Sequence, residues 1–173
     1  SLRMSNTHKL KDGDEIMQEI EFSNNCDLLF FTDKCQVYKA KASDFTDTKA
    51  SVLGDYIAAK LAMDEGENAV RMVATKDYKG IIIFAFENGK VAKVPLEAYA
   101  TKTNRKKLTA AYSDKSPLSA MLFINEDKEI LIKSSSGRML LVHTGALSLK
   151  STRSTQGVAV MKLKKGHRLF EIE

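Results

Sequence analysis

Short apolar runs that alternate with polar turns dominate the chain. Three segments share one layout, an apolar run, a polar turn and an apolar restart, and they cover residues 27–37, 80–91 and 129–139. Apolar runs of this length, bounded by turn residues, are typical of β-strands, and a short turn between two of them predicts a hairpin. The pattern therefore predicts three equivalent β-hairpins.

The turn residues support these hairpins to different degrees. Asn88-Gly89 is the strongest signal, because a tight hairpin needs positive φ at its centre and these residues adopt it at low cost. Ser136-Gly137 occupies the same place in the third segment. In the first segment the place is taken by Cys35, so we expect a looser turn there.

The hairpins recur at a nearly constant spacing. We use Val37, Val91 and Met139 as anchors in their second strands, and these anchors lie 54 and 48 residues apart. The residue eight positions after each anchor is apolar. These three residues are Phe45, Tyr99 and Leu147. Such self-similarity indicates a structural repeat of about fifty residues.

Further apolar segments lie between the hairpins and are expected to be strands. They cover residues 16–22, 69–74, 118–124 and 169–172. Residues 55–63 have the composition of a helix, but their repeat counterpart, residues 157–163, is β-branched and alternating, so both are interpreted as strands. The repeat would then contain about four strands.

A unit of four strands in about fifty residues has the size of a propeller blade. We therefore predict an all-β chain of about thirteen short strands with almost no helix. Residues 1–173 would form a single domain or a fragment of one, with three to four blades in a small ring or an open arc. The approximate repeat units are residues 9–59, 60–107 and 108–173.

Composition narrows the class of protein. The chain has 173 residues, of which 43% are hydrophobic, and its densest apolar runs argue against disorder. No apolar run approaches the ~20 residues that cross a bilayer, and no secretory signal is visible. We expect a cytoplasmic protein without a membrane partner. The two cysteines and three histidines show no zinc-ligand spacing, so no metal site is predicted.

Charge is divided unevenly along the chain. Residues 1–26 and 27–75 each carry a net charge of −2, whereas residues 76–128 and 129–173 carry +4 and +5. A basic C-terminal half favours contact with a polyanion, most often nucleic acid or a membrane surface. A lysine-rich surface that keeps a β protein soluble is the alternative explanation.

Four segments resemble one known family. They cover residues 31–39, 87–94, 136–142 and, above all, 154–166, which reads Ser-Thr-Gln-Gly-Val-Ala-Val-Met-Lys-Leu-Lys-Lys-Gly. They are similar to the repeats of the C-terminal domain of the A subunit of bacterial DNA gyrase and topoisomerase IV, and the similarity extends from about Lys9 to Glu173. The resemblance implies a β-pinwheel, a propeller variant that exchanges strands between neighbouring blades. It also implies a domain that binds and bends duplex DNA around a basic rim.

The resemblance further implies partners and a division of labour. The partners would be duplex DNA and the rest of the topoisomerase, namely the A-subunit core and the B subunit. The catalytic tyrosine of the family belongs to another domain, so this chain would not be an enzyme by itself. Gyrase carries a Gln-Arg-Arg-Gly-Gly-Lys-Gly-like box that no segment here matches, and the corresponding residues 46–54 are nearly neutral. The chain would be of the topoisomerase IV kind or a gyrase fragment without its first blade, and we favour the former.

Basic residues recur at equal distances from the anchors, which predicts a DNA-binding stripe. Offset 11 gives Lys102 and Lys150, and offset 14 gives Arg105 and Arg153. A curved row of such cations can follow the phosphates of a duplex without reading bases. Some further candidates lie near this row, and others lie at hairpin turns or strand starts. For the second group, protection of sheet edges against aggregation is an alternative explanation. The candidates are Lys49, Lys106 and Lys107 for the row and Lys90, Lys93 and Arg138 for the hairpins.

Catalytic motifs are not visible. The sequence has no glycine-rich phosphate loop and no nucleophile motif, so neither catalytic residues nor a cofactor are predicted. The acidic clusters at residues 12–15 and 64–67 lie in expected turns and lack the spacing of a calcium loop. Two function classes remain: a nonspecific DNA-binding and bending module, and a propeller-like scaffold whose basic rim contacts an acidic protein.

Overall fold

The computed structural model describes residues 2–4, 9–11, 14–15, 20–22, 26–45, 61–102 and 106–173, with side chains described in 26–43, 61–102 and 106–173. The chain divides into two compact units. The first unit contains Ser1–Asp77 and Lys102–Ala111, and the second contains Tyr78–Thr101 and Tyr112–Glu173. The described residues form strands, turns and short 3-10 helices without any α-helix. None of the described helices is long and apolar enough to span a membrane.

The three predicted hairpins are confirmed. Each is followed directly by a short 3-10 turn, and each anchor residue lies at or next to the start of the second strand. The three anchors are therefore equivalent positions. The hairpins are β5 (Asp27–Thr32) with β6 (Val37–Lys41), β8 (Ile81–Phe86) with β9 (Lys90–Pro95), and β12 (Glu129–Ser134) with β13 (Met139–His143). The 3-10 turns are η1 (Ala42–Phe45), η3 (Leu96–Tyr99) and η4 (Thr144–Ala146).

Strands are present at the predicted residues 69–74, 118–124 and 169–172 and at residues 20–22 of the predicted strand 16–22, whose residues 16–19 lie outside the described residues. In residues 55–63 the described part, Leu61–Met63, begins with a turn rather than a strand, and the remainder lies outside the described residues. Residues 157–163 contain only a two-residue strand. The strands outside the hairpins are β1 (Leu2–Met4), β2 (Lys9–Lys11), β3 (Asp14–Glu15), β4 (Ile20–Phe22), β7 (Ala69–Thr75), β10 (Lys107–Leu108), β11 (Leu118–Ile124), β14 (Val158–Ala159) and β15 (Leu169–Ile172).

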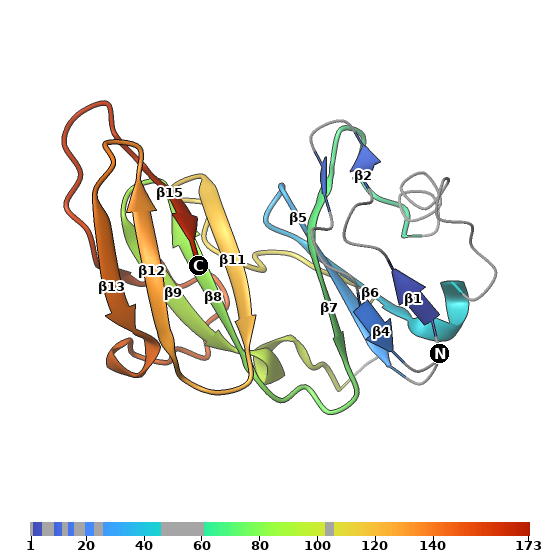
Figure 1. Cartoon of the computed structure of the whole chain (residues 1–173). Coiled ribbons are helices and arrows are strands. Elements are labelled where there is room, and N and C mark those ends of the chain that lie inside the picture. The colour runs from blue at the N-terminus through green and yellow to red at the C-terminus, as the bar shows by residue number, and fades with distance from the viewer. Residues whose placement is uncertain are drawn as a thin grey trace. The chain divides into compact units, whose positions relative to one another are not determined.

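Strand exchange follows from the order of the sheets. The two four-stranded sheets have the orders β10-β6-β5-β7 and β11-β8-β9-β14, and a three-stranded sheet has the order β13-β12-β15. Figure 1 shows β13 and β12 side by side in the last of these sheets. Strand β10 follows the second hairpin in sequence but pairs with β6 of the first, and β14 follows the third hairpin but pairs with β9 of the second. All of these strand pairs are antiparallel. This exchange confirms the predicted all-β pinwheel.

Burial explains why the apolar runs differ between repeats. Central strands β5 and β8 are buried along nearly their whole length, so the side chains on both faces of each strand are enclosed. Strand β12 instead alternates, so one of its faces is more exposed. The aromatic side chains of β5 and β8 are buried, as predicted, and so is Tyr99. In the second unit one core cluster joins the second and third hairpins through Ile83, Val91, Ile130, Ile132 and Leu169.

The turn of the first hairpin differs from our expectation. Cys35 adopts φ 56°, which matches the sign of φ 85° at Gly89 and Gly137. The turn is closed by a hydrogen bond from Thr32 N to Gln36 O of 2.9 Å, and the third hairpin has the same bond between Ser134 and Arg138. The prediction of a looser turn was wrong, because the surrounding hairpin holds a non-glycine residue in the left-handed region.

Candidate nucleic-acid interface

The predicted basic row is divided between the two units. In the first unit Lys102 and Lys106 are exposed. Lys107 is engaged within the protein, because its Nζ lies 3.6 Å from Asp64 Oδ2 and 5.5 Å from the centre of the Tyr38 ring. Lys49 and Arg105 lie outside the described residues. A stripe through Lys102 and a residue of the second unit stays a prediction.

The second unit carries the other half of that row on the loop after η4. Lys150 is exposed, and its backbone N–H donates to Lys93 O at 2.9 Å. Arg153 is half-buried, and its Nη1 donates to the carbonyl oxygen of Ala98 at 3.1 Å. Lys150 is thus presented to solvent, whereas Arg153 anchors the loop on η3.

Lys93 requires a correction. Its side chain is 6% exposed, and its Nζ lies 2.8 Å from Asp127 Oδ1. It also donates to the carbonyl oxygens of Thr144 at 3.0 Å and Leu147 at 3.5 Å. Two hydrogen bonds lower the pKa of the Asp127 carboxyl: the one from Lys93 contributes most, and the one from Thr144 contributes next. Lys93 therefore joins β9 to η4 inside the second unit and is not available to a ligand at the surface.

We expect Lys93→Met to lower the free energy of unfolding by about 2–3 kcal/mol, because two carbonyl groups and a carboxylate would lose their buried donor. Urea denaturation followed by circular dichroism measures this loss. Lys128→Met, at an exposed neighbour of Asp127, is the control and should cost less than about 0.5 kcal/mol. Equal losses in the two variants would contradict the structural role of Lys93.

The C-terminal segment, residues 160–169, lies across the turns of two hairpins. Val160 N donates to Gly89 O at 3.1 Å, and Leu169 N donates to Glu87 O at 3.1 Å, so both ends of the segment contact the β8–β9 turn. A Cβ at Gly89 would lie 2.3 Å from Met161 O, which requires glycine in this turn. On the other side, Ser135 N donates to Arg168 O at 2.8 Å. The backbone thus fixes the segment to both turns.

The apolar side chains of this segment face the interior, and its basic side chains are exposed to solvent. Met161 and Leu169 are buried and Leu163 is half-buried, whereas the intervening basic residues are exposed. Lys164 begins a turn closed by a hydrogen bond from His167 N to Lys164 O of 3.0 Å. The exposed basic residues of the segment are Lys162, Lys164, Lys165, His167 and Arg168.

Two cations predicted from the sequence lie beside this segment. The Nη1 of Arg138 donates to Lys162 O at 3.1 Å, within the segment, whereas the Nζ of Lys90 donates to Gln156 Oε1 at 3.4 Å, in the loop before it. Arg168 is paired with Glu87 at 3.2 Å. Lys162, Lys164 and Lys165 are not paired with a carboxylate in the part of the chain that the structure describes. We name the set of Lys90, Arg138, Lys162, Lys164, Lys165, His167 and Arg168 the hairpin-turn surface.

The lysines of residues 162–165 were not identified as site residues from the sequence. Residues 162–166 belong to the segment that carries the family resemblance, but the sequence analysis assigns no DNA contact to their lysines. The alternation of apolar and basic residues in this stretch was the available signal. This alternation alone does not identify a binding surface. The structure adds that Arg138, 24 residues earlier in the chain, contacts the same segment.

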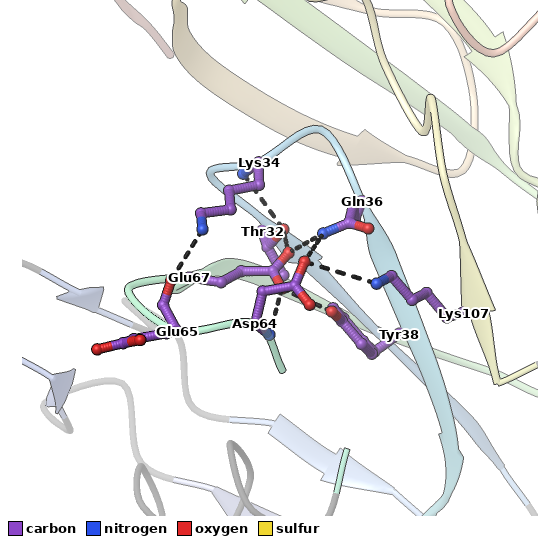
Figure 2. Close-up of polar contacts among 8 residues, drawn as sticks. All are labelled: Thr32, Lys34, Gln36, Tyr38, Asp64, Glu65, Glu67 and Lys107. Atoms are coloured by element: carbon purple, nitrogen blue, oxygen red, sulfur yellow. Dashed lines mark hydrogen bonds and ion pairs between the residues drawn. The ribbon is translucent and has the colours of Figure 1, made fainter. Parts of the chain in front are cut away.

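The acidic turn of the first unit is structural (Figure 2). The Glu67 carboxylate is buried and accepts hydrogen bonds from the hydroxyl of Thr32, from Gln36 Nε2 at 2.7 Å and from Tyr38 OH at 2.6 Å. It also accepts from Asp64 N at 3.1 Å. Burial opposes ionisation, but these donors outweigh it and lower the pKa of Glu67. Within the described residues, no three His, Cys, Asp or Glu side chains are grouped so that they could hold a metal ion.

Known proteins resemble this chain in sequence. The family described as DNA gyrase C-terminal domain, beta-propeller, matches residues 128–172. The A subunit of DNA gyrase from Streptomyces coelicolor is 27% identical over 95% of the chain, and the A subunit of DNA topoisomerase 4 from Staphylococcus epidermidis is 27% identical over 90%. The chain spans about a fifth of the length of these relatives, 20% of each.

Solved structures resemble it in fold. The C-terminal domain of DNA topoisomerase IV superposes with a TM-score of 0.78 at 24% identity, over 94% of this chain and 51% of that domain. The DNA gyrase A C-terminal domain gives a TM-score of 0.61 at 16% identity, over 92% of this chain and 50% of that one. Repeats, strand exchange and relatives together confirm the resemblance of this chain to the C-terminal β-pinwheel domain of the A subunits of DNA gyrase and topoisomerase IV.

Proposed function

We propose that this chain binds and bends duplex DNA, without strong base preference, as the C-terminal domain of the A subunit of a type IIA topoisomerase. The hairpin-turn surface is the observation that carries the proposal. It brings together the exposed cations of residues 162–168 and exposed Arg138 of the β12–β13 turn, with half-buried Lys90 beside them on β9. Backbone hydrogen bonds hold residues 160–169 to both hairpin turns. A duplex carries one phosphate charge per ~1.7 Å of its axis, so such a surface can contact several phosphates at once.

Nonspecific binding follows from the kinds of side chain present. Lysine ammonium groups on exposed turns contact phosphates as point charges and provide little geometry for reading bases. The aromatic residues of β5 and β8 are buried in the sheets and are not available to stack on bases. We include the exposed predicted residues Lys102, Lys106 and Lys150 in the contact set, together with Lys49 and Arg105, which lie outside the described residues. Lys93 is left out because it is buried, and Lys107 and Arg153 are left out because Asp64 and the Ala98 carbonyl hold their side chains.

Bending of the duplex follows from the resemblance, because the C-terminal domain of that family bends DNA around a basic rim. Wrapping a duplex costs elastic energy of order 1–6 kcal/mol for a bend of 40–90°, and additional phosphate contacts can offset that cost. In the complete enzyme this domain would hold DNA while the A-subunit core and the B subunit carry out strand passage. It would act in the cytoplasm, on the chromosome.

Fluorescence anisotropy with a labelled duplex of about 30 base pairs tests binding. We expect the logarithm of the association constant to fall linearly with the logarithm of salt concentration, with a slope of about −4 or steeper, because each phosphate contact contributes about −0.9. Two duplexes of unrelated sequence should bind with affinities within about threefold. Energy transfer between dyes at the two duplex ends should rise on binding, which reports the bend.

The competing function is a scaffold whose basic surface binds an acidic protein. Polyglutamate of matched charge serves as the probe for that function in the same assay. Tighter binding of polyglutamate than of duplex, or a salt slope near zero for the duplex, would contradict the proposed function. Binding without a rise in energy transfer would contradict bending alone.

A further inference from the structure

His167 differs from the other cations of the hairpin-turn surface, because the charge of an imidazole depends on pH. The side chain is exposed, and its backbone N–H donates to Lys164 O at 3.0 Å, which fixes His167 in a turn between the lysines of the segment and Arg168. Lysine and arginine keep their charge near neutral pH, whereas an imidazole gains or loses a proton between about pH 5 and pH 8. His167 is thus the residue that can change the charge of this surface in that range.

The β12–β13 turn holds the ring of His167. Ser135 Oγ lies 3.4 Å from His167 Nδ1 and accepts a hydrogen bond from Arg168 N at 2.9 Å. Because that bond uses one lone pair of the oxygen, the Ser135 hydroxyl can donate to an unprotonated Nδ1, and its second lone pair can accept from a protonated Nδ1. The same contact therefore fits both states, and a change in protonation alters the charge of the surface without moving the ring.

An anion that could pair with a protonated ring has to come from outside. The carboxylates on the adjoining elements are already engaged: Glu87 of the β8–β9 turn is paired with Arg168 at 3.2 Å, and Glu171 of β15 with Lys133 at 3.7 Å. A negative charge close to an imidazole favours its protonated form, and a duplex phosphate supplies such a charge. The other charged groups of the segment and of the β12–β13 turn are cations, namely Lys162, Lys164, Lys165 and Arg138.

We propose that His167 contacts a duplex phosphate in its protonated form, so that this chain takes up a proton when it binds DNA. The inference rests on the proposed function and names one pH-dependent contact within it. Protonation adds one positive charge to a surface whose other charges stay constant, and the phosphate in turn stabilises the imidazolium. Duplex binding is accordingly tighter at pH 6 than at pH 8.

Two substitutions reproduce the two charge states of the ring. His167→Gln gives a polar side chain that is never charged, and His167→Lys gives one that is charged at either pH. For the natural protein at about 0.1 M salt we expect affinity for a duplex of about 30 base pairs to be about three- to eightfold higher at pH 6, with a salt slope steeper by ~0.9. Both variants should lose this pH dependence, the lysine variant binding tightly and the glutamine variant weakly at both pH values. Anisotropy titrations measure these quantities.

His143→Gln is the matched control, because His143 is an exposed histidine at the end of β13 opposite the hairpin turn. Its Nδ1 accepts a hydrogen bond from Gly145 N at 3.0 Å. This variant should keep the full pH dependence of the natural protein. A pH dependence that survives in His167→Gln, or equal affinities of the glutamine and lysine variants at pH 8, would overturn the proposal while leaving duplex binding intact. Failure of all four proteins to bind duplex at pH 6 and low salt would contradict the proposed function and, with it, this inference.

Discussion

Replacing Lys162, Lys164 and Lys165 together by glutamine is expected to weaken duplex binding about 10–100-fold at about 0.1 M salt. The three ammonium groups are exposed on a segment that the β8–β9 and β12–β13 turns hold in place. Each lost phosphate contact reduces the magnitude of the salt slope by ~0.9, so the slope should become shallower by about 2–3. Anisotropy titrations over a range of salt concentrations measure both quantities.

The matched control for this variant removes the same number of charges elsewhere. Lys76, Lys79 and Lys128 are exposed, and Lys79 and Lys128 lie before β8 and β12, at the strand ends opposite the hairpin turns. Their replacement by glutamine should change affinity by less than about threefold. Stability should change by less than about 1 kcal/mol in either variant, because surface charges contribute little to folding. Equal losses of affinity would show that only net charge matters, and the hairpin-turn surface would be rejected as the DNA interface.

Replacing Glu67 by alanine is expected to destabilise the first unit by about 3–5 kcal/mol. The change would leave the buried donors of Thr32, Gln36 and Tyr38 without their shared acceptor. Urea denaturation measures the loss, and amide exchange of residues in β5 and β6 localises it. Glu65→Ala, at an exposed residue of the same turn, should cost less than about 0.5 kcal/mol.

We expect the difference in free energy of unfolding between the natural protein and the Glu67→Gln variant to be smaller at acidic pH. The pKa of Glu67 is lowered in the folded state, so the unfolded chain binds the proton more tightly. The stabilisation is therefore complete above the ordinary glutamate value of 4.5 and is lost as pH falls through the folded pKa. Denaturation at pH 7 and at pH 3 should show a smaller difference at pH 3. An undiminished difference at pH 3 would mean that the carboxylate charge does not contribute.

Much of the fold could be predicted from the sequence, because each hairpin is specified locally. Apolar runs and turn residues lie within about twelve positions of one another, and their recurrence at 54 and 48 residues indicated the repeat. The first turn was predicted less well. Cys35 does not favour positive φ by itself, and only its closed hairpin holds it there.

Sites were harder to predict, since a lysine has the same sequence signal on a surface and in an interior. Lys90 and Lys93 were assigned to one basic group, yet Lys90 contacts a surface glutamine and Lys93 is buried against Asp127, 34 residues later in the chain.

The sequence alone thus determined the class of fold, the repeat, the family resemblance and the basic character of the C-terminal half, because all of these depend on residue type and spacing. The tertiary structure decided which cations are presented to solvent, which are enclosed, and that β13 has an open edge. Those properties depend on which distant strand lies beside a given residue. In this chain that choice is made by strand exchange between repeats, and it brings β10 to β6 and β14 to β9 while leaving β13 uncovered in the described structure.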